Sequence, residues 1–378
     1  MIKKALCCLM LLCVMLSGGC WNYRGLNEMS IVSGFAIDKD GDSGEMKVSF
    51  QIVDLVGNME TEGINGKLLE SSGKTLFDAG RNAKRNIIGK LYFGHTQLVV
   101  ISEDIARNED LKDTIDWMLH DAEMRETLSL VISTEETAKE ILNHDTLVGP
   151  IVAFDVSKYI QDDNKTTAST SYKQLYEVFN TIEGEGIDLT LPAVSNVDNN
   201  GEYIAKIDGT AVFKGERLAG FLTSDESKYL LFATDKIEGG LLTIPASGEG
   251  KDDVTLEIYE NKTKRSFSYR EGKPMIKIDT ETDVFLAECR IHLDALDKQQ
   301  ISMLEQNAAK TLADRMAQLI GKVQSEYGAD IFGFGNMIYK KDHALWHKLS
   351  PNWDTLFPQL EVVVNAKINI INTASIKE

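Results

Sequence analysis

Cysteine is scarce in this 378-residue chain, and its distribution is uneven. Four of the five cysteines lie within the first twenty residues, so the body of the protein contains only Cys289. One cysteine cannot close an internal disulfide, and the fold must therefore rest on hydrophobic cores. A chain of this length has enough residues for two or three domains with cores of their own.

Positive charge is also in short supply. The chain has 40 Lys and Arg against 58 Asp and Glu, a net charge of −18. Residues 1–19 contain only Lys3 and Lys4, so the remainder holds 38 against 58, or −20. A body this acidic is repelled by phosphate backbones, which argues against nucleic-acid binding. We also expect it to gain nothing from anionic lipid headgroups, so net charge does not explain a membrane attachment.

Long hydrophobic runs are missing after the first twenty residues. Residues 5–16 are apolar, but this run is shorter than the roughly 20 residues that a membrane-spanning helix needs. A basic head, this run and the small residues of Ser17-Gly18-Gly19 have the layout of a cleaved secretory signal. Cys20 follows directly, as in lipoproteins, where the cysteine thiol receives a diacylglyceryl group. We predict a signal over 1–19 and lipidation at Cys20; the alternative is an ordinary signal with an incidental cysteine.

The first half of the body mixes strand and helix patterns. Apolar residues alternate over 29–37 and 46–52, which predicts two strands joined by an acidic hairpin loop at 38–45. Helical spacing and strand-like runs then follow one another. The expected helices are 75–88, 111–120, 134–143, one starting at Pro150, and 172–182; the expected strands are 95–101 and 128–133; and 162–171 is expected to be a loop.

The second half is expected to begin near Asn199. Strands are predicted at 205–214, 218–223, 254–259, 264–269, 275–278, 284–291 and 360–370, and helices at 225–234 and 299–327, with Gly328 as the stop. Runs of strands followed by a helix favour an α+β fold with several domains, in which mixed or antiparallel sheets each pack with helices. We therefore expect an N-terminal α+β region at 20–199, with two subdomains, and a C-terminal α+β domain at 200–378.

Two groups of residues have spacings that invite a metal-binding interpretation. Asp38, Asp40 and Asp42 begin like a calcium loop, but the required glycine and glutamate are replaced by Ser43 and Ser49, so a hairpin turn is favoured.

His343 and His347 are four residues apart, yet Ala344 stands where a zinc protease has its glutamate. Cys289 lies in an apolar stretch and is expected to be buried and inert. Gly333 and Gly335 lack the residues of a phosphate loop and predict a tight bend instead. We expect no enzymatic activity, no metal and no cofactor.

The residues from the predicted lipidation site onward resemble a known family. Cys20, Trp21 and Leu26 match the Cys-Trp-Asp-x-x-Glu-Leu start of the mature C subunit of spore germinant receptors, the Ger(x)C lipoproteins. Asn22 and Gly25 stand in place of the two usual acids. The match lies directly on the lipidation cysteine, which makes this short motif specific.

A second stretch, 328–373, resembles the C-terminal domain of the same family. It contains a closing strand and these residues: Asp330, Phe332, Gly333, Phe334, Gly335, Trp346 and Trp353. Ala374 stands where the family often has a glycine. The resemblance covers the whole chain in length and in the order of its elements.

This resemblance implies a three-domain α+β body outside the membrane. It implies two polytopic membrane subunits, of A and B type, as partners in a complex that senses nutrients at the spore inner membrane. It also implies a lipid-anchored position on the outer face of that membrane, no enzymatic activity and no cofactor. The expected function is that of a scaffold or transducer needed for spore germination.

Trp21 and Leu26 are candidate residues next to the anchor. Trp21 suits the headgroup interface, and it equally suits the core of the first strand layer. Whether the body binds a small molecule is left open. The alternative function is a substrate-binding lipoprotein of an importer, although the strand runs after Ala205 disfavour its two repeated α/β lobes. A lipid-anchored hydrolase would need a convergent catalytic set that the sequence does not contain.

Overall fold

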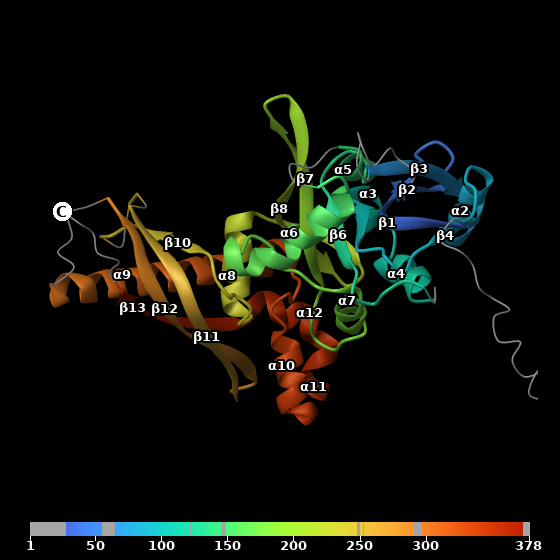
Figure 1. Ribbon diagram of the computed structural model, residues 1–378. Coiled ribbons are helices and arrows are strands. Elements are labelled where there is room, and N and C mark those ends of the chain that lie inside the picture. The colour runs from blue at the N-terminus through green and yellow to red at the C-terminus, as the bar shows by residue number, and fades with distance from the viewer. Residues whose placement is uncertain are drawn as a thin grey trace, which may run out of the picture.

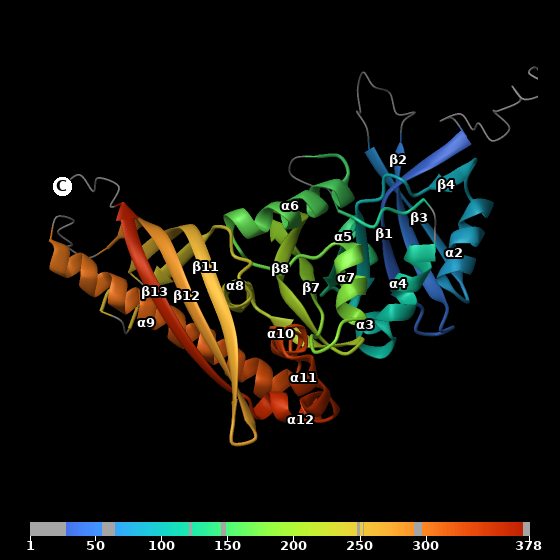
Figure 2. The same cartoon turned by 90° about the horizontal axis from the view of Figure 1, so that it is seen from below.

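The computed structural model describes residues 28–54, 65–120, 123–144, 149–247, 250–251, 253–290 and 297–372. The predicted signal and the predicted site residues Cys20, Trp21 and Leu26 lie outside this part of the chain. The described residues form two β-sheets at opposite ends of an elongated body, with helices packed on each (Figures 1 and 2). This confirms the predicted α+β class with mixed sheets.

The larger sheet has nine strands in the order β3-β2-β1-β5-β6-β7-β8-β9, and β4 pairs with β1 beside β5. Strands β1, β5, β6 and β7 are parallel to one another, and the outer strands add antiparallel pairs. The strand bounds are β1 Met29–Lys39, β2 Met46–Asp54, β3 Asn65–Gly73, β4 Lys90–Tyr92, β5 Leu98–Ser102, β6 Ser129–Ser133, β7 Thr190–Asn199, β8 Glu202–Lys214 and β9 Arg217–Leu222.

Helices cover both faces of this sheet (Figure 2). The helices are α2 Leu76–Asn82, α3 Glu103–Asn108, α4 Leu111–His120 and α7 Leu175–Ile182 on one face, and α5 Lys139–Leu142 and α6 Val152–Thr166 on the other. Val99 and Ile101 of β5 pack into the first layer, whereas Leu98 and Val100 pack into the second. Strand β5 is therefore buried along its whole length, as is usual for parallel strands between helix layers.

The smaller sheet has four strands in the order β10-β11-β12-β13, and only its last pair is parallel. The bounds are β10 Leu241–Ile244, β11 Val254–Arg270, β12 Lys273–Cys289 and β13 Glu361–Asn372. Helix α9 (Lys298–Lys322) lies along one face (Figure 2). Val362 and Val364 pack toward that core, while Val363 and Asn365 are exposed on the other face.

The two sheets meet around four further helices: α8 Ser224–Ala233, α10 Phe334–Lys341, α11 His343–Leu349 and α12 Trp353–Leu356. Helix α8 lies between the sheets, and α10 to α12 form a cluster beside the meeting point (Figure 1). The core of the smaller sheet includes residues of α8, α9 and this cluster, together with Val212 of β8 and Leu222 of β9. The two ends of the molecule are thus joined by continuous apolar packing.

Several sequence predictions are confirmed. Helix α4 has the predicted bounds, and α9 with the following π-turn, Val323–Tyr327, covers the predicted 299–327. Gly328 ends this helix in the left-handed conformation, with φ of 58°. The acidic loop at 38–45 is a hairpin turn in which the Asp40 carboxylate accepts the N–H groups of Asp42 and Ser43. The predicted strands at 254–291 merge into the two long strands β11 and β12.

Other predictions about single elements are wrong. Only 139–142 of the predicted helix 134–143 is helical, because Asp38 accepts the N–H groups of Ala138 (2.6 Å) and Lys139 (3.1 Å) and fixes a later start. The predicted loop 162–171 is helical as far as Thr166. Helix α2 ends at Asn82 and is followed by a short 3-10 turn, not by helix to residue 88. Strand β5 begins at Leu98 instead of residue 95.

The expected boundary near Asn199 coincides with a hairpin tip. Strands β7 and β8 pair across it and belong to the same sheet, and their hairpin projects from the body (Figure 1). By sheet membership the larger body ends with β9 at Leu222, before β10 begins the smaller sheet. A division of the chain into two domains near residue 199 stays a prediction.

Candidate functional site

The residues considered for metal binding and catalysis do not converge in the structure. His343 and His347 lie on α11 and are exposed. Cys289 ends β12 and is half-buried, not fully buried as expected, because it lies at the last residue of the strand. Among the described residues, no group of three or more His, Cys, Asp or Glu side chains is arranged to hold a metal ion. No helix in the same ranges is both long and apolar enough to cross a membrane.

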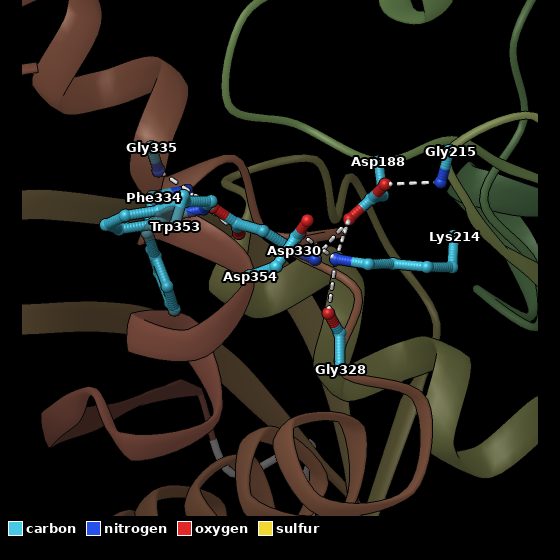
Figure 3. A network of polar contacts seen from close by, with 9 residues as sticks. All are labelled: Asp188, Lys214, Gly215, Gly328, Asp330, Phe334, Gly335, Trp353 and Asp354. Atoms are coloured by element: carbon cyan, nitrogen blue, oxygen red, sulfur yellow. Dashed lines mark hydrogen bonds and ion pairs between the residues drawn. The ribbon is translucent and has the colours of Figure 1, made fainter. Parts of the chain in front are cut away.

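The most developed polar site is the contact between the two bodies, centred on Asp330 (Figure 3). Asp330 follows the Gly328 stop and is 2% exposed. Its carboxylate accepts N–H groups from the backbone of Phe334 at 3.0 Å and Gly335 at 2.8 Å, and the Trp353 indole N–H at 3.2 Å. Asp330 therefore holds the start of α10 and the start of α12 against the end of α9.

The larger body contributes Asp188 to this contact. One Asp188 carboxylate oxygen accepts the Asp330 N–H at 2.6 Å, and the Asp188 N–H donates to the Asp330 carbonyl at 2.9 Å. The other carboxylate oxygen accepts the Gly215 N–H, at 2.8 Å, from the β8–β9 turn. Asp188 thus binds the loop after α7, the β8–β9 turn and the loop before α10 into one unit, which we call the aspartate junction.

Lys214, at the end of β8, supplies the positive charge of the aspartate junction. Its ammonium group donates to the Gly328 carbonyl at 2.7 Å and to the Asp354 carboxylate, and it lies 3.8 Å from an Asp188 oxygen (Figure 3). The contact with Gly328 also satisfies a carbonyl at the end of α9, where positive charge favours the helix dipole. Lys214 consequently ties the end of strand β8 in the larger sheet to the helix that covers the smaller sheet.

The backbones approach closely beside these polar contacts. Gly186 has φ of +67°, and a Cβ there would lie 2.5 Å from the Gly335 carbonyl carbon and 2.7 Å from the Trp346 ring. The Gly186 carbonyl accepts the Asn336 N–H at 2.7 Å. Any other residue at position 186 would need both a strained backbone and a displaced α10. The segment 184–188 is therefore shaped to fit against residues 330–336.

Burial sets the protonation of the two carboxyl groups. It raises the pKa of Asp330 to about 7, and the three N–H groups that it accepts oppose this shift only in part. Burial also raises the pKa of Asp188 above its ordinary value. The junction pairs these carboxyl groups with backbone N–H groups and with the Lys214 ammonium group. Its arrangement serves to hold backbone N–H groups and to fix the two bodies together.

The sequence predicts only some of the residues of the aspartate junction. The family resemblance includes Asp330, Gly335 and Trp353, and of these only Gly335 has a predicted role, in a tight bend with Gly333. Gly186 and Asp188 lie between the predicted helix 172–182 and the predicted strand 205–214, where the sequence pattern predicts no element, and Lys214 is only the last residue of that strand. The available signal is the Gly-Glu-Gly-Ile-Asp run at 184–188, which combines two acids with two glycines that permit close backbone approach.

Comparisons with known proteins cover nearly the whole chain. A model described as the spore germination protein N-terminal domain matches residues 22–196, and one described as spore germination B3/GerAC like, C-terminal, matches residues 208–374. Spore germination protein KC of Bacillus subtilis is 27% identical over 99% of this chain and 97% of its own length. Spore germination protein B3 of the same organism is 23% identical over 95% of each chain. The crystal structure of the GerBC protein has the same fold, with a TM-score of 0.56, 22% identity and coverage of 90% of this chain and 97% of its own.

Proposed function

The chain belongs to the Ger(x)C family of spore germination proteins, and from this we propose that it is the lipid-anchored, non-catalytic subunit of a nutrient germinant receptor. The observation that carries the proposal is the match of both family models, in order, along a chain whose Cys20 directly follows a signal-like segment. The alternative, a substrate-binding lipoprotein of an importer, has no comparable support.

The proposed attachment is the lipid on Cys20. Cys20 precedes the first described strand by nine residues, so the diacylglyceryl group would hold the body within about 30 Å of the bilayer surface, at about 3.4 Å per extended residue. Two acyl chains on one residue anchor a protein stably, whereas a single chain binds only marginally. We place the protein on the outer face of the spore inner membrane.

The proposed task is that of a scaffold and transducer for two polytopic membrane subunits. Confinement to a surface raises the local concentration of the body beside such partners without any new contact. The aspartate junction supports this role, because it makes the larger and smaller bodies one connected unit that can bridge partner surfaces. No cofactor or catalytic step enters this proposal.

The anchor is tested with Cys20→Ala in the spore-forming host. We expect the variant to lose incorporation of radiolabelled palmitate, to leave the spore membrane fraction and to cause a germination defect toward one class of nutrient. Cys13→Ala is the matched control, because Cys13 lies in the apolar run before the predicted cleavage site and would be absent from the mature protein. Normal germination with an unacylated, released Cys20→Ala protein would contradict the proposal.

The scaffold role is tested by affinity purification from detergent-solubilised spore membranes. We expect the wild-type chain to retain two multi-span proteins and Cys20→Ala to retain much less of both. Isothermal titration of the body with amino acids and sugars distinguishes the importer alternative. Tight binding of one such compound together with no retained multi-span protein would favour a substrate-binding lipoprotein.

A further inference from the structure

The net charge of −18 conceals a basic segment in the larger body. Residues 74–90 contain five cationic side chains and one acid: Lys74, Arg81, Lys84, Arg85, Lys90 and Asp78. This segment has a local charge of +4, taken as five minus one, in a chain that is otherwise strongly acidic. It includes α2 and the turn after it, and it ends at the start of β4. The expectation from net charge, that this protein gains nothing from anionic lipids, therefore does not apply to this end of the molecule.

Three of these cations line a pocket of about 370 Å³ together with aromatic rings. We call it the basic pocket; the residues used here are Phe77, Arg81, Lys84, Lys90, Phe93 and Trp117. None of the side chains that line it is acidic. The Arg81 guanidinium lies 5.0 Å from the centroid of the Phe77 ring, and the Lys90 ammonium pairs with Glu123. Within the described residues, Arg81 and Lys84 have no carboxylate partner, so both remain available to an anion.

Two apolar side chains beside these cations are turned to solvent. Phe77 is 58% exposed and Ile88 is 95% exposed. Exposed aromatic and aliphatic side chains among lysines and arginines are the composition of surfaces that rest on a bilayer interface, where rings lie at headgroup level and cations meet phosphates. Phe77 and Ile88 therefore add apolar contact area to a surface whose positive charge suits phosphate groups.

The basic pocket lies close to the point from which the chain leaves for Cys20. Met29 pairs with Lys90 and the two strands are parallel, so β1 and β4 begin at the same end of the sheet. Gly89, with φ of +93°, is packed against Glu28, since a Cβ there would lie 2.4 Å from the Glu28 carbonyl oxygen. In both views α2 and β4 lie at the end of the molecule away from the smaller sheet (Figures 1 and 2). A lipid on Cys20 would therefore bring this end toward the bilayer.

We propose that the basic pocket and its exposed neighbours Phe77 and Ile88 dock on the anionic phospholipid headgroups of the membrane, as a second attachment beside the lipid anchor. The occupant is a lipid surface because positive charge and exposed apolar side chains occur together within reach of the anchoring residue. Docking at this end makes the long axis of the body point away from the bilayer, with the smaller sheet outermost. The orientation depends on the proposed anchor, whereas the binding of headgroups does not.

The test uses the full chain carrying Cys20→Ala, so that acylation does not contribute. Partition onto phosphatidylglycerol-containing vesicles is compared with partition onto pure phosphatidylcholine vesicles, at about 50 mM and about 500 mM salt. We expect binding to the anionic vesicles at low salt to exceed both binding at high salt and binding to phosphatidylcholine vesicles. Adding Arg81→Gln and Lys84→Gln should lower that binding about 25-fold, since each cation contributes about 1 kcal/mol and 1.4 kcal/mol is tenfold.

Lys340→Gln with Lys348→Gln is the matched control. It removes the same charge from exposed lysines of α10 and α11, and all variants keep the same N-terminal residues. Ile88→Asn is the second test variant; it keeps every charge and should weaken vesicle binding several-fold. Circular dichroism melts establish that each variant is folded.

Equal losses in the two double variants would overturn the proposal. Vesicle binding unchanged by Arg81→Gln and Lys84→Gln, with lost retention of a multi-span protein, would assign the pocket to a protein partner instead. An unacylated Cys20 in the wild-type protein would defeat the anchor but leave the vesicle result standing.

Discussion

The two sheets of this protein bury their strands in different ways. In the larger sheet, helices cover both faces, and neighbouring residues such as Val99 and Val100 pack into different cores. In the smaller sheet, α9 covers one face, and neighbours such as Val362 and Val363 differ in exposure. The exposed face of the smaller sheet has ladders of opposite charge instead, including Lys367 with Glu281. A strand between two helix layers buries side chains on both of its faces. A strand covered on one side only needs apolar side chains on that one face.

The largest loss of stability is expected from a substitution at the contact between the two bodies. Asp330→Ala removes a buried carboxylate and leaves two backbone N–H groups and one indole N–H without their acceptor. We expect a loss of about 3–5 kcal/mol in the free energy of unfolding, with the smaller body unfolding separately from the larger one. Urea unfolding followed by tryptophan fluorescence and by circular dichroism would show two transitions in place of one.

Asp354→Ala is the control for this prediction. Its carboxylate belongs to the same network through Lys214, but its side chain is 81% exposed. Its removal should cost less than about 1 kcal/mol. Equal losses from Asp330→Ala and Asp354→Ala would mean that Asp330 does not hold the junction.

A smaller effect is expected from a methyl group placed at the close backbone approach. Gly186→Ala introduces a Cβ within 2.5 Å of Gly335 in a left-handed conformation, and we expect a loss of about 3 kcal/mol. Gly215→Ala tests the conformation alone, because its φ is +60° and no atom lies within 4 Å of the new Cβ. That variant should lose about 1 kcal/mol. Thermal unfolding of the Gly186→Ala and Gly215→Ala variants would separate the cost of the steric clash from the cost of the strained backbone.

The dependence of stability on pH should differ in sign between the junction and the larger body. The pKa of Asp330 is raised to about 7, above its unfolded value, so the folded state binds more protons and stability falls as pH rises from about 4 to 7. In the larger body, burial lowers the pKa of Lys173 to about 7, and its ammonium donates to the Thr190 hydroxyl at 2.7 Å. The unfolded state then binds more protons, so stability rises as pH increases from about 7 toward 10.5.

Each group changes stability by at most about 1.4 kcal/mol per pH unit within its window. Asp330→Asn should flatten the slope below pH 7, and Lys173→Met should flatten the slope above it. Unfolding free energies measured in urea across both windows test the pair. A slope that either variant leaves unchanged would assign that titration to another residue.

The smallest losses of stability are expected from valine-to-threonine substitutions within single strands of the two sheets. Val99→Thr and Val100→Thr each place a hydroxyl in a fully buried position of β5, so both should cost about 1.5 kcal/mol. In β13, Val362→Thr should cost about 1 kcal/mol, while Val363→Thr should stay within about 0.5 kcal/mol of wild type because its side chain is 37% exposed. Denaturation midpoints of the four variants would show alternation in one strand only.

These differences explain which elements were predictable from the sequence. Strand β13 and helix α9 have one apolar face each, and their periodicity gave nearly correct bounds. The start of α5 was not predictable, because Asp38 caps it from a strand one hundred residues earlier in the chain. The aspartate junction is not predictable from local sequence patterns for the same reason, because Asp188 and Asp330 are far apart in the sequence and come into contact only in the folded protein. The net charge of the whole chain does not indicate the basic pocket, because its cations lie in one short segment of an acidic sequence.

The parallel pairing of β12 with β13 has a consequence for the order in which the protein is completed. All of α9 to α12 lies between these two strands in the chain, so β13 is synthesised more than seventy residues after β12. Until it arrives, one edge of β12 is unpaired, and open strand edges favour aggregation. If the chain crosses a membrane as proposed, the smaller body can close only after its last strand has emerged on the far side. A stop codon shortly before Glu361 should therefore produce a protein that is degraded or aggregated, although its larger sheet is intact in sequence.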